Sequence, residues 1–363
     1  MTTRHPTAAC AVLQAERACS RAPSSGARAR PALRRTALSA LLLAATVAAI
    51  AASDAPADAQ KPLPVMLVDT LNTLSGGPHA GFRANHAKGV LVTGKFTPAA
   101  SAAGFSKAPH FAKSVPVTVR FSNGTGVPTI PDSNPNASPH GIAIRFQLAD
   151  GGSTDIVSIS ARSFPVATPE EFLGLLQSIA ASGTSTEKPS PIEKFLGSHP
   201  AAAKWVSTPR PAPVSFATLS FYGVNAFKFT NAKGESHYAR YQIIPLAGEH
   251  ALDAAAAEKA APDYLMDELP KRIAKDPVKY RLLAQVAKEG DVVDDATVEW
   301  PADRERIELG VLTLTGAVAD QIPAQKALLF NPLALPEGIE PSTDPVLMVR
   351  PAAYAVSYGQ RAQ

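Results

Sequence analysis

Cysteine is almost missing from this sequence of 363 residues. Its two cysteines, Cys10 and Cys19, both lie within the first 59 residues. Residues 60–363 therefore form no disulfide and offer no thiolate, either as a nucleophile or as a metal ligand. Cysteine-based zinc sites and thiolate-bound metal centres are both excluded from this part of the chain.

Residues 60–363 also lack an excess of charge of either sign. The formal net charge of +4 arises in residues 1–59, which hold seven arginines and three acidic residues, whereas the remainder holds 28 basic and 28 acidic residues. Binding of nucleic acid needs a basic stripe or patch, and no such cluster stands out in the sequence. We therefore expect no nucleic-acid partner.

The sequence contains no apolar run of the roughly 20 residues that a bilayer span needs. Its best candidate, residues 37–52, has 16 residues. Arg34 and Arg35 precede this run, and a small-x-small pattern follows it at residues 57–59. Basic residues, an apolar stretch and a small-residue cleavage site, in this order, predict a secretory signal and export to the periplasm. The alternative is that residues 37–52 remain as an inner-membrane anchor, with the rest of the chain facing the periplasm.

We accordingly divide the chain into a basic leader, residues 1–59, and a core domain, residues 60–363. Short β-rich segments separated by turn residues make up much of the core domain, and this pattern predicts antiparallel strands. The expected strands are residues 89–96, 115–121, 141–148, 154–159, 214–219, 226–230, 237–244, 295–300 and 307–315.

Helices are expected among these strands. Thr168, Pro169 and Glu171 form a capping pattern that begins a helix. The other helical candidates are residues 65–74, the stretch 250–290 and the tail 346–361, which Pro351 interrupts. The spacing of the strands favours an α+β fold, with a closed antiparallel barrel and added helices, over a parallel sheet.

Several polar residues could carry chemistry, although each one alone has an ordinary structural explanation. A single histidine near a strand, such as His86, is most often structural, and Arg83 could be a surface cation. Arg350 and Tyr354 are four residues apart, so a helix would present both on one face. Taken alone, this pair indicates packing.

The order of the motifs along the chain is more informative than any one of them. The motifs are Arg83-x-x-His86-Ala-Lys-Gly89, Val119-Arg120-Phe121-Ser122, His140-Gly141-x-Ala143, Asp155-x-Val157 before Phe164 and Phe172, the segment 221–228, Phe330-Asn-Pro332, Gly338-Ile-Glu-Pro-Ser342, and Arg350-x-x-x-Tyr354 between Asp344 and Arg361. In this order and spacing, from about residue 70 to 361, they resemble the motifs of the catalase family.

This resemblance implies a catalase-like barrel and haem b, with its iron, as the cofactor. Tyr354 would bind the iron from one side as a phenolate, which is the axial ligand of catalases. Arg350, a cation one helical turn away, favours that charged form. On the other side, His86 would be the catalytic acid and base, and Ser122 would orient its ring.

The resemblance also implies how the rest of the cofactor is held. Arg83, Arg120 and Arg361 would pair with the haem propionates, because guanidinium groups bind carboxylates through two parallel hydrogen bonds. Phe164 and Phe172 would supply apolar walls of the haem pocket.

The chain departs from the family pattern at two places. Catalases carry an asparagine after the Asp-x-Val segment, and alignment without gaps puts Ile159 there, with Ser160 as the nearest polar residue. Losing a positioned donor can cost on the order of 10²-fold or more in rate. The wrapping segment and C-terminal domains of typical catalases also have no counterpart, so the chain resembles the small catalase-related peroxidases.

We therefore expect a haem peroxidase that reduces hydrogen peroxide or organic hydroperoxides with an organic electron donor, and that has weak or no catalase activity. One alternative is an enzyme that transforms lipid hydroperoxides. The other is a non-catalytic barrel that binds haem or another apolar ligand, which His86 and Ser122 disfavour because a carrier needs no acid–base group. Without the covering segments, a monomer or a small homo-oligomer is expected.

Overall fold

The computed structural model describes residues 61–362. The expected leader, including the apolar run at 37–52, lies outside these described residues. Within them, no helix is both long enough and apolar enough to cross a membrane. They belong to one compact unit, residues 60–363.

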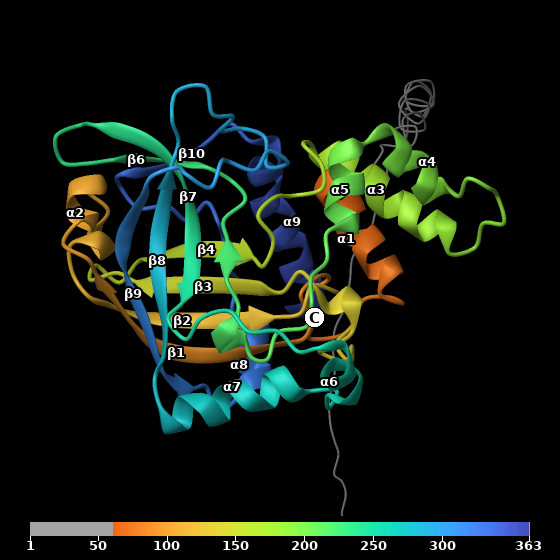
Figure 1. The fold of residues 1–363 in the computed structure, drawn as a ribbon, viewed down its shortest axis with the longest axis horizontal. Helices are drawn as coiled ribbons and strands as arrows, with labels where there is room; N and C mark the ends of the chain where they lie inside the picture. The colour runs from red at the N-terminus through yellow and green to blue at the C-terminus, as the bar shows by residue number, and fades with distance from the viewer. Residues whose placement is uncertain (1–60, 363) are drawn as a thin grey trace, which may run out of the picture. The chain divides into compact units, whose positions relative to one another are not determined.

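An antiparallel β-barrel forms the centre of this unit (Figure 1). Among the described residues, the strand order is β10-β6-β7-β5-β4-β3-β2-β1-β9-β8, and a further pairing between β7 and β8 closes the barrel. Eight strands form the closed ring, while β6 and β10 extend the sheet beside β7. The expected α+β fold with a closed barrel is confirmed. The strands are β1 (Gly89–Pro98), β2 (Val115–Ser122), β3 (Gly141–Gln147), β4 (Ser153–Ile159), β5 (Phe221–Tyr222), β6 (Phe227–Thr230), β7 (Ser236–Pro245), β8 (Val278–Val286), β9 (Arg306–Ala317) and β10 (Ile339–Pro341).

Alternation of side chains along the strands decides which residues fill the barrel and which lie outside it. On β2, Phe121 belongs to the large apolar core, so its neighbours Arg120 and Ser122 lie on the outer face. Strand pairing extends this outer face from Ser122 to Gly141 on β3 and then to Ile159 on β4. The outer face of β2–β4 therefore carries two of the polar residues that the sequence singled out, Arg120 and Ser122.

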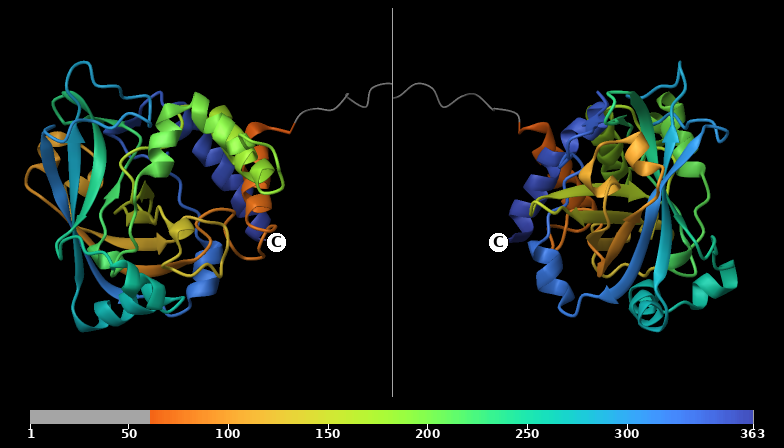
Figure 2. Two further views of the ribbon diagram at one scale, coloured as in Figure 1. Left: turned by 45° about the vertical axis from the view of Figure 1, so that its right-hand side comes forward. Right: turned by 90° about the vertical axis from the view of Figure 1, so that its left-hand side faces the viewer.

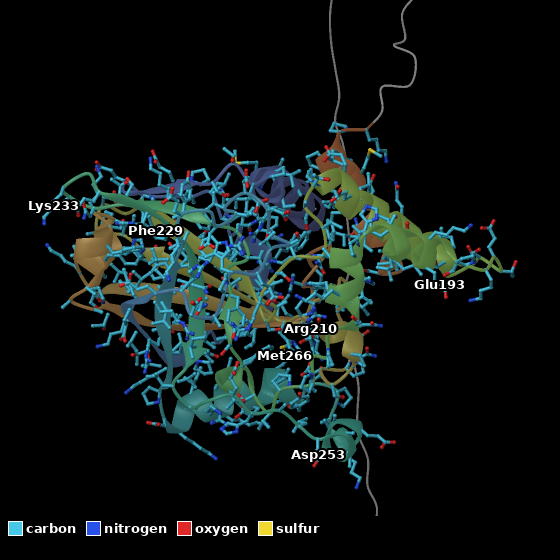
Figure 3. All side chains as sticks on the ribbon, turned by 45° about the horizontal axis from the view of Figure 1, so that its top comes forward. Glu193, Arg210, Phe229, Lys233, Asp253 and Met266 are labelled. Atoms are coloured by element: carbon cyan, nitrogen blue, oxygen red, sulfur yellow. The ribbon has the colours of Figure 1, made fainter. Side chains whose placement is uncertain are left out.

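Helices cover the outer face of the barrel. Helices α1, α3 and α9 pack against one another, and Figures 1 and 2 show them together on one side of the barrel. Figure 3 labels exposed Glu193 on α4 and buried Phe229 on β6. They lie on opposite sides of the unit, one in the helical layer and the other in the sheet. The α-helices are α1 (Leu63–Leu74), α2 (Ala102–Phe105), α3 (Pro169–Ser182), α4 (Pro191–Ser198), α5 (Pro200–Ser207), α6 (Ala254–Lys259), α7 (Tyr264–Lys275), α8 (Gln321–Ala327) and α9 (Pro345–Ala362).

The starts of α3 and α9 follow from their capping residues. The hydroxyl of Thr168 accepts a hydrogen bond from the main-chain N–H of Glu171, and the Glu171 carboxylate accepts one from the N–H of Thr168. The carboxylate of Asp344 accepts two main-chain N–H groups from the first turn of α9. The expected interruption of α9 at Pro351 is wrong, because the capped helix packs against α1 and continues through this proline.

Two expected strands are wrong because local hydrogen bonds hold the chain in turns. At residues 214–219, the Ser215 hydroxyl accepts a hydrogen bond from Ala217 N–H, and Phe216–Thr218 forms a 3₁₀ turn. At residues 295–300, Arg240 on β7 donates to the carbonyl oxygens of Asp295 and Val298. These main-chain groups therefore bind an arginine side chain instead of pairing with a strand.

The expected helical stretch 250–290 is correct only in its first part. Helices α6 and α7 occupy it, but residues 278–286 form β8. Side chains alternate between buried and exposed over the first four residues of β8, as at buried Val278, exposed Lys279 and buried Tyr280. This period of two indicates a strand, whereas the alanine- and lysine-rich composition had favoured a helix.

Candidate functional site

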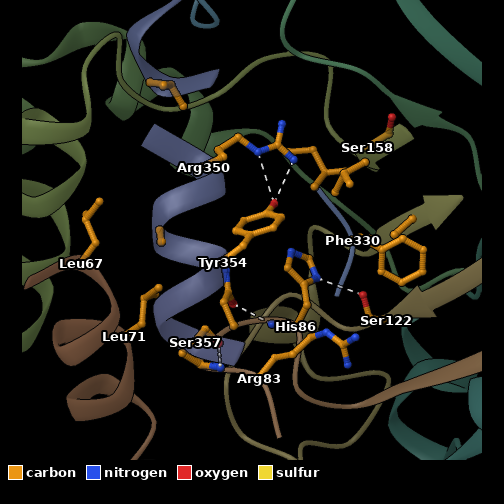
Figure 4. A pocket seen from close by; sticks show the side chains of 18 of the residues that line it. Leu67, Leu71, Arg83, His86, Ser122, Ser158, Phe330, Arg350, Tyr354 and Ser357 are labelled. Atoms are coloured by element: carbon orange, nitrogen blue, oxygen red, sulfur yellow. Dashed lines mark hydrogen bonds between the residues drawn. The ribbon is translucent and has the colours of Figure 1, made fainter. Parts of the chain in front are cut away.

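A cavity lies between the outer face of β2–β4 and the helices α1, α3 and α9. The loop before β1, the strand β2 and the helix α9 each direct polar side chains into it (Figure 4). All nine residues that the sequence singled out line this cavity: Arg83, His86, Arg120, Ser122, Phe164, Phe172, Arg350, Tyr354 and Arg361.

His86 occupies an unusual backbone conformation at the cavity. Its φ of 56° makes it the only non-glycine residue with positive φ among the described residues, and this region is strained for a side chain with a β-carbon. The His86 Nδ1 lies 3.1 Å from the Ser122 hydroxyl oxygen (Figure 4). Gly141 leaves room for this contact, because a β-carbon there would lie 2.8 Å from both atoms.

The imidazole of His86 is neutral at physiological pH. Burial, and next the positive charge of Arg120, lowers the pKa of His86 to about 3. A hydrogen bond to the main chain of Asn123 opposes this shift. The Nδ1 atom faces the Ser122 hydroxyl, and Nε2 is the candidate to accept a proton from a molecule in the cavity.

A chain of hydrogen bonds holds Tyr354 on α9. Arg350 donates to the Tyr354 hydroxyl oxygen from Nη2 at 2.9 Å and from Nε at 3.2 Å (Figure 4). Arg350 Nη1 donates to Asn225 Oδ1 at 2.8 Å, and Asn225 Nδ2 donates to Asp344 Oδ2 at 2.7 Å. Two donated hydrogen bonds, both from a cation, suit an oxygen atom that carries negative charge.

Arg83, Arg120 and Arg361 gather three guanidinium groups in the cavity. Burial, and then the charge of Arg361, lowers the pKa of Arg83 to about 9, and burial with the other two arginines lowers the pKa of Arg120. Their hydrogen bonds go to neutral acceptors: Arg83 and Arg361 donate to the Leu328 carbonyl oxygen, and Arg120 donates to the Gln325 side chain. Such a cluster suits an anionic ligand, because buried cations are stable only when paired.

Apolar side chains form much of the cavity wall. The rings of Phe164 and Phe172 have centroids 5.0 Å apart, and both line the cavity. Ile159 also lines it, as the alignment without gaps predicts. Ser160 directs its hydroxyl to the main chain, where it accepts the N–H of His140 at 2.9 Å. The β4 wall thus presents an isoleucine where catalases carry an amide donor.

Asn225 and Gln325 contact the site, but sequence reasoning did not find them. Asn225 lies 125 residues before Arg350, and Gln325 lies 205 residues after Arg120. Contacts between such distant residues leave no local pattern. The one available signal was the place of Asn225 in the segment 221–228, which forms β5, a short connection and the start of β6.

The residues present fit haem. Apolar walls suit a flat tetrapyrrole, three guanidinium groups suit its two carboxylates, and the Tyr354 oxygen suits ferric iron. Within residues 61–362, no group of three or more histidine, aspartate or glutamate side chains could hold a metal ion.

Comparison with known proteins agrees with this geometry. The sequence profile of the family described as Catalase matches residues 80–362. A "Catalase-related peroxidase" of Synechococcus elongatus is 35% identical over 291 residues, covering 78% of this chain and 85% of that protein. A protein with the same description from Mycolicibacterium paratuberculosis is 35% identical over 287 residues, covering 78% and 90%.

Full catalases match over a smaller share of their length. The catalase of Pseudomonas syringae is 30% identical over 289 residues, which cover 75% of this chain and 56% of that enzyme. Among solved structures, a fungal catalase superposes with a TM-score of 0.70 at 23% identity, covering 78% of this chain and 59% of the other. Catalase A from Saccharomyces cerevisiae also superposes with a TM-score of 0.70, and the match covers 81% of this chain and 64% of that protein. With a family match over residues 80–362 and these relatives, the chain belongs to the catalase family.

Proposed function

We propose that this protein is a haem peroxidase, which reduces hydrogen peroxide or organic hydroperoxides with electrons from an organic donor. The observation that carries the proposal is the placement of His86 and Tyr354 on one cavity, each with its own orienting partner. Ser122 contacts the ring of His86, and Arg350 contacts the oxygen of Tyr354. Membership of the catalase family and two relatives described as catalase-related peroxidases support it.

Two sets of residues would hold haem b. Tyr354 would bind the iron, and Arg83, Arg120 and Arg361 would pair with the propionates. Bound haem would supply the redox-active iron that the reduction of peroxide requires. Phe164 and Phe172 would exclude water from the cavity, which strengthens the polar interactions inside the site.

His86 moves the proton in this reaction. Its neutral ring would take a proton from one oxygen of the peroxide and return it to the departing oxygen, so that an alcohol or water leaves instead of an anion. The Ser122 hydroxyl and the Asn123 carbonyl keep the ring in position during both transfers. Overall, one peroxide with two protons and two donor electrons gives an alcohol, or water, and one further water.

Ile159 directs the enzyme away from the disproportionation of peroxide. Disproportionation requires that a second peroxide molecule be held and oxidised in the same cavity. An isoleucine side chain donates no hydrogen bond to that molecule, whereas oxidation of an organic donor does not depend on one at this position. We therefore assign the protein weak or no catalase activity.

One set of assays on residues 60–363 loaded with haem tests this function. The absorption spectrum reports the haem ligand, an oxygen electrode reports disproportionation, and an aromatic dye reports donor oxidation. Rapid dye oxidation with little oxygen release is expected. Conversion of a fatty-acid hydroperoxide without any donor would favour a hydroperoxide-transforming enzyme instead, and haem binding without peroxide chemistry would leave a binding protein.

We also propose that residues 60–363 act in the periplasm as a monomer or a small homo-oligomer. The Arg34-Arg35 pair, the apolar run 37–52 and the small residues at 57–59 support export. Cell fractionation with N-terminal sequencing is expected to find a mature chain that begins at Gln60 in the periplasmic fraction. A full-length chain in the membrane fraction would instead indicate an anchor. Light scattering of the mature chain measures its oligomeric state.

A further inference from the structure

A buried polar network lies behind His86, next to the residues that hold its ring. Lys88 Nζ lies 2.7 Å from Asp132 Oδ1, and Asn123 Nδ2 donates to the same oxygen at 2.8 Å. Asn123 Oδ1 lies 3.1 Å from His140 Nδ1. The exposed fractions of Asn123, Asp132 and His140 are 0%, 1% and 2%, so these groups have little contact with water and depend on one another.

The network has a fixed direction. The Asp132 carboxylate only accepts hydrogen bonds, and its other oxygen accepts the main-chain N–H of Leu265. Asn123 must therefore point its NH₂ group towards Asp132 and its oxygen towards His140. That oxygen can only accept, so Nδ1 of His140 carries the proton. The amide of Asn123 does not ionise, so it cannot pass a proton between Asp132 and His140. The network is therefore a rigid frame and not a route for protons.

Three of the four members, all except Asp132, lie one or two residues in sequence from a residue at the His86 ring. Lys88 comes two residues after His86, Asn123 directly follows Ser122, and His140 directly precedes Gly141. Main-chain bonds reinforce these links, because Asn123 N–H donates to the carbonyl oxygen of Lys88 at 3.0 Å. The network thus joins the loop of His86 to the ends of β2 and β3.

The backbone of His86 needs such a frame. A residue with a β-carbon at a φ of 56° is strained, and a strained conformation persists only where its surroundings determine it strongly. We propose that Lys88, Asp132, Asn123 and His140 are positioning residues, which hold His86 in this conformation and so aim its free ring nitrogen at the ligand. This inference rests on the proposed role of His86 in peroxide cleavage.

Cyanide binding to the haem-loaded protein tests the positioning role without a turnover assay. Cyanide enters as HCN and must lose its proton to bind ferric iron, so its association rate depends on a well-placed base. We expect Asp132→Asn and His140→Leu to slow association about 10-fold to 100-fold, because a shift of the base by about 1 Å lowers a rate by up to about 100-fold. His140→Asn retains an N–H donor and is expected to restore most of the rate.

Asp291→Asn is the control, because Asp291 is a partly buried carboxylate that also forms an ion pair, with Arg304 at 2.7 Å. It is expected to leave the cyanide rate unchanged. Equal rates in Asp132→Asn and the unmutated protein, or equal slowing in Asp291→Asn, would overturn the positioning role. So would a His140→Asn protein as slow as His140→Leu. If His140→Leu does not fold, Asp132→Asn decides the question.

A second readout separates this inference from the proposed function. In the haem-free protein, ¹⁵N chemical shifts report the tautomer of the His86 ring. One dominant tautomer in the unmutated protein and a mixture in Asp132→Asn support the frame, and identical spectra contradict it. A protein that shows these effects but oxidises no donor would overturn the peroxidase assignment and leave the frame standing.

Discussion

The ring of His86 stays uncharged far into the acid range, because burial and the Arg120 cation lower its pKa to about 3. A base works only when unprotonated, so the second-order rate constant for reaction with peroxide is expected to stay level from pH 8 to about pH 5. It should fall only as the pH approaches the lowered pKa. Stopped-flow absorbance of the haem band measures this profile. A half-maximal rate near pH 6.5, the ordinary pKa of imidazole, would contradict the assignment.

Replacing His86 tests its chemistry directly. His86→Asn suits the position because asparagine tolerates positive φ better than most residues, yet its amide accepts no proton. The rate constant for peroxide is expected to fall by about 10²-fold to 10⁴-fold, the usual contribution of a positioned acid–base group. The haem content, measured from the absorption spectrum, should be unchanged. A variant as fast as the unmutated protein would remove His86 from its role.

Ile159 sets the balance between two outcomes of peroxide chemistry. Ile159→Asn places an amide donor on the cavity wall and is expected to raise oxygen release relative to dye oxidation, by about 10-fold or more. An oxygen electrode and a dye assay on the same sample give this ratio. Ile159→Val keeps the wall apolar and serves as the control. A flat ratio in Ile159→Asn would show that this position does not limit disproportionation.

Residues whose partners are close in sequence, or whose spacing matches a family motif, could be identified before the structure. The pair Arg350 and Tyr354 follows from helix geometry, and the ordered motifs placed His86 and Ser122 together. Asn225 could not be identified in this way, because its contact with Arg350 arises only when α9 packs near the turn after β5. Tertiary contacts of this kind depend on the whole fold.

At the level of one element, the start of β3 must approach the His86 ring closely. A methyl group at Gly141 would lie 2.8 Å from both His86 Nδ1 and Ser122 Oγ, so Gly141→Ala has to push the strand and the ring apart. We expect the peroxide rate constant to fall about 10-fold to 100-fold with the barrel intact. Gly104→Ala on α2 is the control, since nothing lies within 4 Å of its added carbon. Equal rates in both variants would show that the contact can relax.

Helices and strands could be predicted where the local sequence pattern was clear. The predictions were wrong where contacts made only in the folded protein determined the local structure. Strands β1–β4 are short β-rich segments bounded by turn residues, and all four matched expectation within about two residues. The turn at Phe216 could not be foreseen, because a Ser215 hydroxyl competes with strand pairing only in the folded context. For β8 the signal was present after Pro277, but the composition of the surrounding stretch obscured the alternation.

At the scale of the whole unit, buried neutral histidines make stability depend on pH. Burial lowers the pKa of His86 and of His110 to about 3 and that of His140 to about 4, while all three titrate near 6.5 in the unfolded chain. Between these values only the unfolded state binds the protons, so the free energy of unfolding falls as the pH drops below 6.5. Three protons correspond to a slope of about 4 kcal/mol per pH unit.

His110→Phe isolates one of these protons. His110 is 1% exposed, packs against the rings of Phe96, Phe111 and Phe146, and has no hydrogen-bond partner on either ring nitrogen. Phenylalanine keeps these ring contacts and binds no proton, so the slope between pH 6.5 and 5 should fall by about 1.4 kcal/mol per pH unit. Urea unfolding at several pH values measures it. Above pH 7 the two curves should run parallel, because neither state of either protein charges this site. An unchanged slope below pH 6.5 would mean that His110 binds a proton in the folded barrel.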